Sequence, residues 1–371
     1  MRRTPALIIG GGPAGAAAGI LLARGGADTR LIERSTGSHD VVCGGFLGWD
    51  ALAALNALGI DPAALGARPI HHLRLVTAHR SIEVRLPRPA AGLSRRTLDA
   101  ALLEAAVAAG ACVDRGKAVR QIDASSRSVR LDDGEEIGAD ALFLASGKHD
   151  VRGAPRLPAR ARAAMTLGLR ARLPFCEAHQ QALAGVVELH LFDDGYAGFL
   201  LQEDGSTNVC LSAANHRLNQ AGGIQPLMAR LVKEQPRFGE RLREARTDQW
   251  TAVAGVPYGW RVRHGEHGLF RLGDQAAVIA SLTGDGIAIA LRSGMRAASA
   301  FLARGPEGAV PFQEEFARDA AMPLRIASTL RWAAERPVAR GAAIGLIGTM
   351  PSLARLAAAL TRIDRRAGAP E

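Results

Sequence analysis

A glycine-rich turn between two apolar segments constrains the fold of this chain more than any other feature. Residues 7–34 read LIIGGGPAGAAAGILLARGGADTRLIER, which is an apolar run, a turn, an Ala/Leu-rich helix and a second apolar run ending at Glu33. Gly10, Gly12 and Gly15 follow the Gly-x-Gly-x-x-Gly pattern, in which the second glycine lets the backbone approach a pyrophosphate at a helix N-terminus. An acidic residue about twenty positions later can accept hydrogen bonds from a ribose. The stretch therefore predicts a Rossmann-like α/β domain that binds a dinucleotide.

The charge and the cysteine content of the chain argue against a nucleic-acid-binding protein, a metal site and a disulfide-rich protein. The chain has 371 residues, a formal net charge of +10 and only 4% aromatic residues, so aliphatic side chains must fill most of the core. Nearly all the positive charge is scattered arginine. We therefore expect no nucleic-acid surface, although a basic protein can associate weakly with an acidic membrane surface. The four cysteines form no Cys-x-x-Cys pair, so we expect no metal site, no disulfide framework and a reduced, cytoplasmic setting.

The distribution of apolar residues predicts three parts. Strand–helix–strand patterns suggest a discontinuous dinucleotide-binding domain, and short alternating segments with Gly/Asp turns suggest an antiparallel sheet that forms a substrate domain. The end of the chain is expected to be helical, and its apolar stretch is interrupted by arginines, so no membrane span is expected. The three parts are 1–68 with 92–155 and 263–312, then 69–91 with 156–262, and finally 313–371.

A second motif lies in the last third of the chain. Gly273 and Asp274 follow an apolar strand, where a carboxylate can accept a hydrogen bond from a polyol hydroxyl. The sequence Gly284-Asp285-Gly286-Ile287 then opens a helix, whose N-terminus favours negative charge on an adjacent group. The alternative is an ordinary strand–turn–helix connection in which Asp274 caps the helix.

A third motif precedes the helix that begins near Leu98. Arg95 stands at its start, from which a guanidinium can reach a phosphate or a ribitol. A surface salt bridge is the alternative for this arginine.

In order and spacing, these three motifs resemble those of the FAD-dependent oxidoreductases with the p-hydroxybenzoate hydroxylase fold, over about residues 1–310. The resemblance implies an extended FAD with its ring between the domains, NAD(P)H as a transient reductant, and the second sheet as the roof of an apolar substrate pocket. The implied FAD contacts are Gly10, Gly12, Pro13, Ala14, Gly15, Glu33, Arg34, Cys43, Gly44, Arg95, Val119, Ala145, Ser146, Gly147, Gly273, Asp274, Gly284, Asp285, Gly286 and Ile287. The expected pocket residues are Phe46, Tyr196, Phe199 and Tyr258.

Two segments bear on the reaction. Cys43-Gly44-Gly45 resembles the geranylgeranyl-reductase-like branch. As a thiol beside the flavin, Cys43 is the candidate catalytic residue, a proton donor; the alternative is a small residue that packs a glycine loop. The segment Tyr196-Ala197-Gly198-Phe199-Leu200-Leu201 lacks the Trp and Pro of the Tyr-x-Trp-x-Phe-Pro stretch of those reductases. We therefore favour a monooxygenase of secondary metabolism that hydroxylates an apolar aromatic or phenolic-lipid substrate. Reduction of isoprenoid C=C bonds and a non-catalytic lipid-binding flavoprotein are the alternatives.

Overall fold

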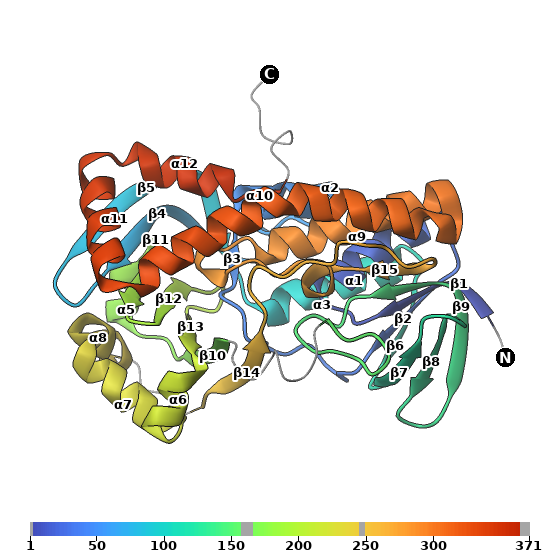
Figure 1. The fold of residues 1–371 in the computed structure, drawn as a ribbon, viewed down its shortest axis with the longest axis horizontal. Coiled ribbons are helices and arrows are strands. Elements are labelled where there is room, and N and C mark those ends of the chain that lie inside the picture. The colour runs from blue at the N-terminus through green and yellow to red at the C-terminus, as the bar shows by residue number, and fades with distance from the viewer. Residues whose placement is uncertain (1–2, 157–165, 245–248, 364–371) are drawn as a thin grey trace.

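The computed structural model contains two β-sheets that lie side by side, with a long helix running past both (Figure 1). It describes residues 3–156, 166–244 and 249–363. The remaining positions of the three predicted parts, 1–2, 157–165, 245–248 and 364–371, lie outside the described residues.

The first sheet carries the N-terminal glycine-rich turn. Its strand order is β6-β2-β1-β9-β8-β7, with β15 beside β9; β6, β2, β1, β9 and β15 run parallel, and β7 and β8 complete it as an antiparallel extension. Helices α1, α3 and α9 cover one face of this sheet through a single apolar core. The elements are β1 (Arg3–Ile9), α1 (Pro13–Arg24), β2 (Thr29–Glu33), α3 (Arg95–Ala108), β6 (Cys112–Arg115), β7 (Val119–Asp123), β8 (Ser128–Leu131), β9 (Glu136–Leu144), β15 (Leu269–Arg271) and α9 (Gly286–Arg304).

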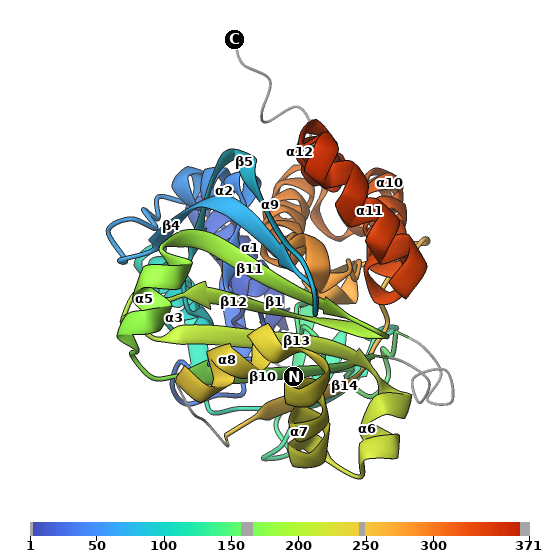
Figure 2. The same cartoon turned by 90° about the vertical axis from the view of Figure 1, so that its left-hand side faces the viewer.

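The second sheet has the order β14-β10-β13-β12-β11-β4-β5-β3. Its neighbours pair antiparallel except for β11 and β4, which run parallel. Helices α5, α7 and α8 cover one face, so only the other face is available to form a site (Figure 2). The elements are β3 (Phe46–Leu47), β4 (Arg68–Val76), β5 (Ser81–Gly92), β10 (Thr166–Leu173), α5 (Glu177–Leu183), β11 (Gly185–Phe192), β12 (Gly195–Leu201), β13 (Thr207–Ala214), α6 (Asn215–Ala221), α7 (Ile224–Glu234), α8 (Pro236–Glu244) and β14 (Thr251–Val256).

The C-terminal part is helical. Helix α10 (Ala309–Glu335) contacts β15 of the first sheet and β11 and β12 of the second, and α11 (Pro337–Thr349) and α12 (Ser352–Leu360) follow it. Helix α2 (Trp49–Ala57) and the short 3₁₀ turns η1 (Gly273–Gln275), η2 (Ser281–Thr283) and η3 (Gly305–Gly308) complete the described structure. The predicted fold class is confirmed: a Rossmann-like domain, a mainly antiparallel second sheet and a helical C-terminus.

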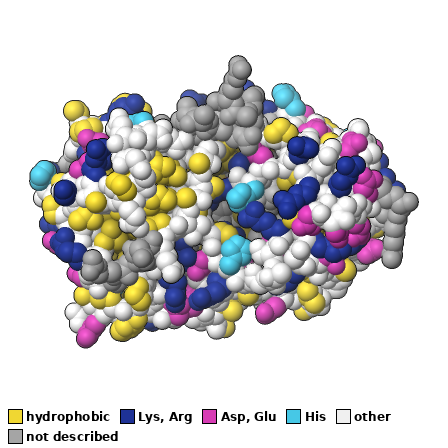
Figure 3. Space-filling view, turned by 90° about the horizontal axis from the view of Figure 1, so that it is seen from below, with side chains coloured by type: hydrophobic (Ala, Val, Ile, Leu, Met, Phe, Trp, Pro, Cys, Tyr) yellow, Lys and Arg dark blue, Asp and Glu magenta, His cyan; other side chains and the backbone are white. Residues whose placement is uncertain are grey.

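The surface differs between the two halves. On the face seen from below, apolar atoms gather over the half that holds the second sheet, whereas acidic and basic side chains intermingle over the other half (Figure 3). Among the described residues no single helix is long and apolar enough to cross a membrane. Helices α11 and α12, which meet at an angle of 114°, satisfy the length and apolarity criteria only when taken together.

Helices α1 and α9 touch backbone to backbone. A Cβ added to Gly294 of α9 would overlap the carbonyl oxygen of Ala14 in α1, and one added to Gly15 would overlap the carbonyl oxygen of Gly10. Both glycines are therefore required by close approach, and they fix the start of α1 against the first strand and against α9.

We expect Gly294→Ala to destabilise the fold by about 1–3 kcal/mol, because the backbone must move to admit the methyl group. The matched control is Gly341→Ala, also within a helix, where nothing lies within 4 Å of the added Cβ. That control should be neutral or stabilising, since alanine favours helix more than glycine does. Thermal unfolding followed by circular dichroism measures both, and an unchanged melting temperature for Gly294→Ala would contradict the packing argument.

Candidate functional site

A cavity of about 360 Å³ is lined by the glycine-rich turn, by the uncovered face of the second sheet and by the C-terminal helices. Such a volume falls within the usual range for small-molecule sites. Most of the lining from the second sheet is aliphatic, and the C-terminal helices add further aliphatic side chains. Representative members are Leu73, Leu75, Val187, Leu189, Ile344 and Ile347.

The glycine-rich turn provides a seat for a pyrophosphate. Gly12 precedes α1, no side chain caps the helix, and its first N–H groups are therefore available. A Cβ added to Gly12 would meet only the guanidinium of Arg95, 3.3 Å away, so the space in front of this turn is open and bordered by a cation. Gly12, Pro13 and Ala14 all line the cavity.

Arg95 is held firmly at this seat. Ser94 caps α3, and the Nε and one terminal nitrogen of Arg95 donate to the two carboxylate oxygens of Asp99, each at 2.7 Å. Burial lowers the pKa of Arg95, but Asp99 more than offsets this, so its pKa lies above the usual value. Arg95 is therefore a fixed cation on the cavity wall, suited to a phosphate.

Glu33 lies at the end of β2, behind the turn. Its carboxylate oxygens accept hydrogen bonds from the backbone N–H of Gly11 at 2.7 Å and of Ser35 at 2.8 Å. The backbone carbonyl of Glu33 accepts from the N–H of Lys117, two residues before Val119 begins β7. Several of the expected contacts do not line the cavity itself, namely Gly10, Gly15, Glu33, Arg34, Val119, Ser146 and Asp285.

The opposite end of the seat is built by η1 and the start of α9. Gly273 has a positive φ of 54°, and its N–H donates to Ser293 Oγ at 2.8 Å, which ties η1 to α9. Asp274 lines the cavity near Lys148. Burial lowers the pKa of Lys148, but its neighbours, Asp274 foremost, raise it more, so the ammonium form is favoured.

The cavity leaves open space in front of Gly12 and of three further glycines, which fits a flat, phosphorylated cofactor. A Cβ at Gly44, Gly147 or Gly286 would meet nothing within 4 Å, and all three line the same cavity as Gly12. Ala145, Gly284 and Ile287 line it too. With Arg95 at one end and the N-terminus of α9 at the other, the residues fit an extended FAD: phosphates at the turn and an electron-accepting ring at α9.

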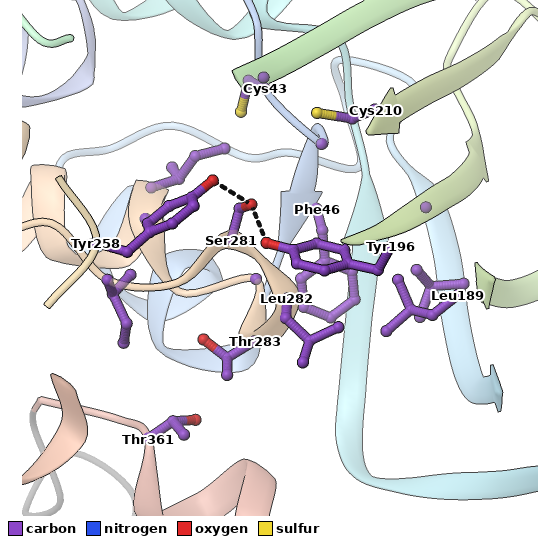
Figure 4. Close-up of a pocket in the computed structure, with 18 of the residues that line it drawn as sticks. Cys43, Phe46, Leu189, Tyr196, Cys210, Tyr258, Ser281, Leu282, Thr283 and Thr361 are labelled. Atoms are coloured by element: carbon purple, nitrogen blue, oxygen red, sulfur yellow. Dashed lines mark hydrogen bonds between the residues drawn. The ribbon is translucent and has the colours of Figure 1, made fainter. Parts of the chain in front are cut away.

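Two cysteines face the cavity (Figure 4). The thiol of Cys43 accepts a hydrogen bond from the N–H of Gly45 at 3.5 Å, and it interacts with Arg95 and Lys148. Asn208 of β13 donates to the carbonyl oxygens of Cys43 and Gly44 at 3.0 and 2.8 Å, which holds this loop against the second sheet. Burial raises the pKa of Cys210 to about 12, so Cys210 remains a thiol.

A chain of three hydroxyl groups supplies polar contacts on the cavity wall. Tyr196 and Tyr258 both hydrogen-bond to Ser281 Oγ, at 2.5 and 2.8 Å (Figure 4). Burial is the main reason that the pKa of Tyr196 lies well above its usual value, and the neighbouring Tyr258 raises it further. The Tyr196 hydroxyl therefore stays protonated, and the hydroxyl chain can hydrogen-bond a carbonyl oxygen. The guanidinium of Arg331 lies 4.8 Å from the ring centre of Tyr258. Ser281 was missed from the sequence, although it stands three residues before the predicted Gly284.

The structure corrects the expectation for Phe199. Tyr196, Gly198 and Leu200 of β12 line the cavity, as does Phe46 of β3. Phe199 points to the opposite face, where its ring packs edge-on against His190 and Phe238 under α8. Successive side chains of a strand alternate between faces, so Phe199 cannot lie in the pocket beside Leu200.

Arg362, which no sequence motif indicated, joins the C-terminus to this site. It lines the cavity, pairs with Asp285 at the start of α9 and with Asp50 at 3.2 Å, and lies 4.1 Å from the Trp49 ring centre. The Asp285 side chain, expected to contact the cofactor, is instead directed to this arginine.

We expect Gly12→Val to fold yet lose bound flavin, because the isopropyl group would occupy the space in front of the turn. The control is Gly37→Val, where nothing lies within 4 Å of the added Cβ and the residue is outside the cavity lining. Flavin absorbance per protein after purification gives the result. Wild-type flavin content in Gly12→Val would rule out this seat.

We expect Asp274→Ala to weaken FAD binding by about 1–3 kcal/mol, the range for a hydrogen bond to a charged group. Titration of the apoprotein with FAD, followed by fluorescence, measures the change in Kd. Asp140→Ala, an exposed carboxylate outside the cavity lining, should bind FAD as the wild type does. Equal Kd values for the two variants would contradict a contact between Asp274 and the cofactor.

The FAD binding domain family matches residues 3–150. The chain is 28% identical over 361 residues to the menaquinone reductase of Mycolicibacterium smegmatis, covering 88% of this chain and 85% of that protein.

Solved structures share the fold. A triple mutant of the flavin-dependent brominase Bmp2 superposes with a TM-score of 0.77 at 17% identity, over 97% of this chain and 95% of that one. A geranylgeranyl bacteriochlorophyll reductase-like protein of Thermoplasma acidophilum gives 0.73 at 19% identity, over 97% and 93%. Residues 3–150 therefore form an FAD-binding domain, and the chain as a whole has the fold shared by these flavin-dependent proteins.

Proposed function

We propose that this enzyme is a flavin-dependent reductase that saturates a C=C bond in an isoprenoid lipid with a carbonyl-bearing head, such as a prenylated quinone. The observation that carries the proposal is the cavity: an aliphatic wall that includes, among its polar groups, the thiol of Cys43 and the Tyr196–Ser281–Tyr258 chain. The similarity to a menaquinone reductase over most of both chains supports the same substrate class.

The aliphatic wall and the hydroxyl chain suit the two ends of such a substrate. Leu73, Leu75, Val187, Leu189 and Leu191 form one side, and an isoprenoid chain placed against them would lose its contact with water. The hydroxyls of Tyr196 and Tyr258 would donate to a carbonyl oxygen of the head and orient it.

Reduction of a C=C bond needs a hydride at one carbon and a proton at the other. FAD held at this seat and reduced by NAD(P)H would supply the hydride. The Cys43 S–H provides the proton, because this thiol lies on the cavity wall beside the seat. Arg95 and Lys148 place positive charge near the sulfur and offset the negative charge left after the transfer. A solvent proton then restores the thiol.

Hydroxylation of an apolar aromatic or phenolic-lipid substrate by oxygen and NAD(P)H is a second candidate. The observation in its favour is the segment 196–201, which lacks the tryptophan and proline of the reductase stretch and leaves Gly198 and Leu200 on the cavity wall.

We expect the enzyme to turn over without oxygen. The purified holoenzyme, NADPH and a menaquinone would be incubated anaerobically, and mass spectrometry should show a gain of two hydrogens in the side chain. Cys43→Ala should lose this activity by about a hundredfold or more, as is typical for loss of a proton donor, while retaining FAD. Cys112→Ala, an exposed cysteine outside the cavity, should remain active. A product that forms only in air and contains an atom from ¹⁸O₂ would show hydroxylation instead.

A further inference from the structure

Helices α11 and α12 are apolar on two sides. Ile344, Ile347, Ala354 and Ala357 face inward and line the cavity. The C-terminal apolar face points outward and consists of Val338, Leu346, Met350, Leu353 and Leu356, all exposed. Exposed apolar side chains that gather on one surface mark an interaction site more often than scattered ones do, so this outer face suits a second apolar environment.

The charged residues within the helix pair itself are all basic. Residues 336–363 contain four arginines and no acidic residue. Arg340 pairs with Asp193 and Arg362 with Asp285, whereas Arg336 and Arg355 are exposed at the two helices. A second copy of this chain would bring the same arginines together, which disfavours a symmetric dimer through this face. An anionic lipid surface would meet both the apolar and the basic groups.

The last turn of α10 adds an interfacial aromatic group. Trp332 is exposed, and the guanidinium of Arg336 lies 4.9 Å from its ring centre. Tryptophan and arginine are both favoured at the boundary between lipid headgroups and acyl chains.

The shape of the helix pair fits a surface rather than a span. Neither helix alone is long and apolar enough to cross a bilayer, and the two meet at 114°. Both also form part of the cavity wall, so they belong to the folded enzyme.

We propose that α11 and α12 dock the enzyme on an anionic lipid surface, with the C-terminal apolar face in the headgroup–acyl boundary and Arg336 and Arg355 against lipid phosphates. A substrate dissolved in that bilayer would then be separated from the cavity only by the helices that line it. This second step rests on the proposed function, whereas the docking does not.

Vesicle flotation tests the docking without turnover. The holoenzyme would be mixed with vesicles of phosphatidylcholine alone, or of phosphatidylcholine and phosphatidylglycerol in equal parts. We expect binding to the anionic vesicles, weakened by salt. The double variant Leu346→Gln/Leu356→Gln should bind about tenfold or more weakly, and Arg336→Gln/Arg355→Gln should lose the preference for phosphatidylglycerol.

A matched control distinguishes binding through this face from nonspecific binding of exposed apolar side chains to lipid. Val107 is 56% exposed, close to the 55% of Leu346 and the 54% of Leu356, and Phe175 is more exposed still. Val107→Gln/Phe175→Gln should float like the wild type. Equal flotation of the leucine variant, or no wild-type flotation, would overturn the proposal. Flavin content and turnover of detergent-dispersed menaquinone should be unchanged in the leucine variant, so loss of docking is distinguishable from failure of the proposed chemistry.

Discussion

The rest of the molecule depends on the backbone contact between α1 and α9. Gly294 permits that contact, and Gly15 permits the equally close approach of α1 to the first strand. The N–H of Gly273 then donates to Ser293 of the same helix, so the η1 turn is carried on α9 as well. The two ends of the cofactor seat are therefore parts of one rigid unit, and the distance between the phosphate turn and the ring edge is set by helix packing rather than by loops.

The polar and apolar parts of the site come from different parts of the fold. Arg95, Lys148 and the N-termini of α1 and α9 bring positive charge and free N–H groups to one side. The second sheet contributes an aliphatic surface interrupted by the tyrosine–serine chain. This arrangement suits an anionic cofactor and an apolar substrate, because the cofactor can contact the positively charged wall and the substrate can contact the aliphatic wall. The loop at Cys43, held by Asn208, lies where the two walls meet.

The sequence was sufficient for the fold class and for the glycine-rich seat, because Gly12, Asp274 and Gly286 belong to local motifs whose spacing reflects backbone geometry. The sequence was not sufficient to predict which side chains of β12 face the cavity. The segment around Phe199 is apolar on both sides, and on neighbouring β11 the polar residues Glu188 and His190 are buried on the covered side. Alternation then no longer distinguishes the cavity face from the core. The role of Arg362 could not be predicted from the sequence either, because its partners are remote in the chain and no local pattern marks them.

The ion pair of Arg362 with Asp50 has a consequence for how the enzyme is made. The two residues are separated by 312 positions, so Asp50 is synthesised almost a full chain length before its partner. In chain order, the strands and helices that seat the cofactor precede the wall formed by α11 and α12. Arg362, between Asp50 and Asp285, is thus the point at which a late segment of the chain is joined to the start of α9 and to a residue near the start of α2.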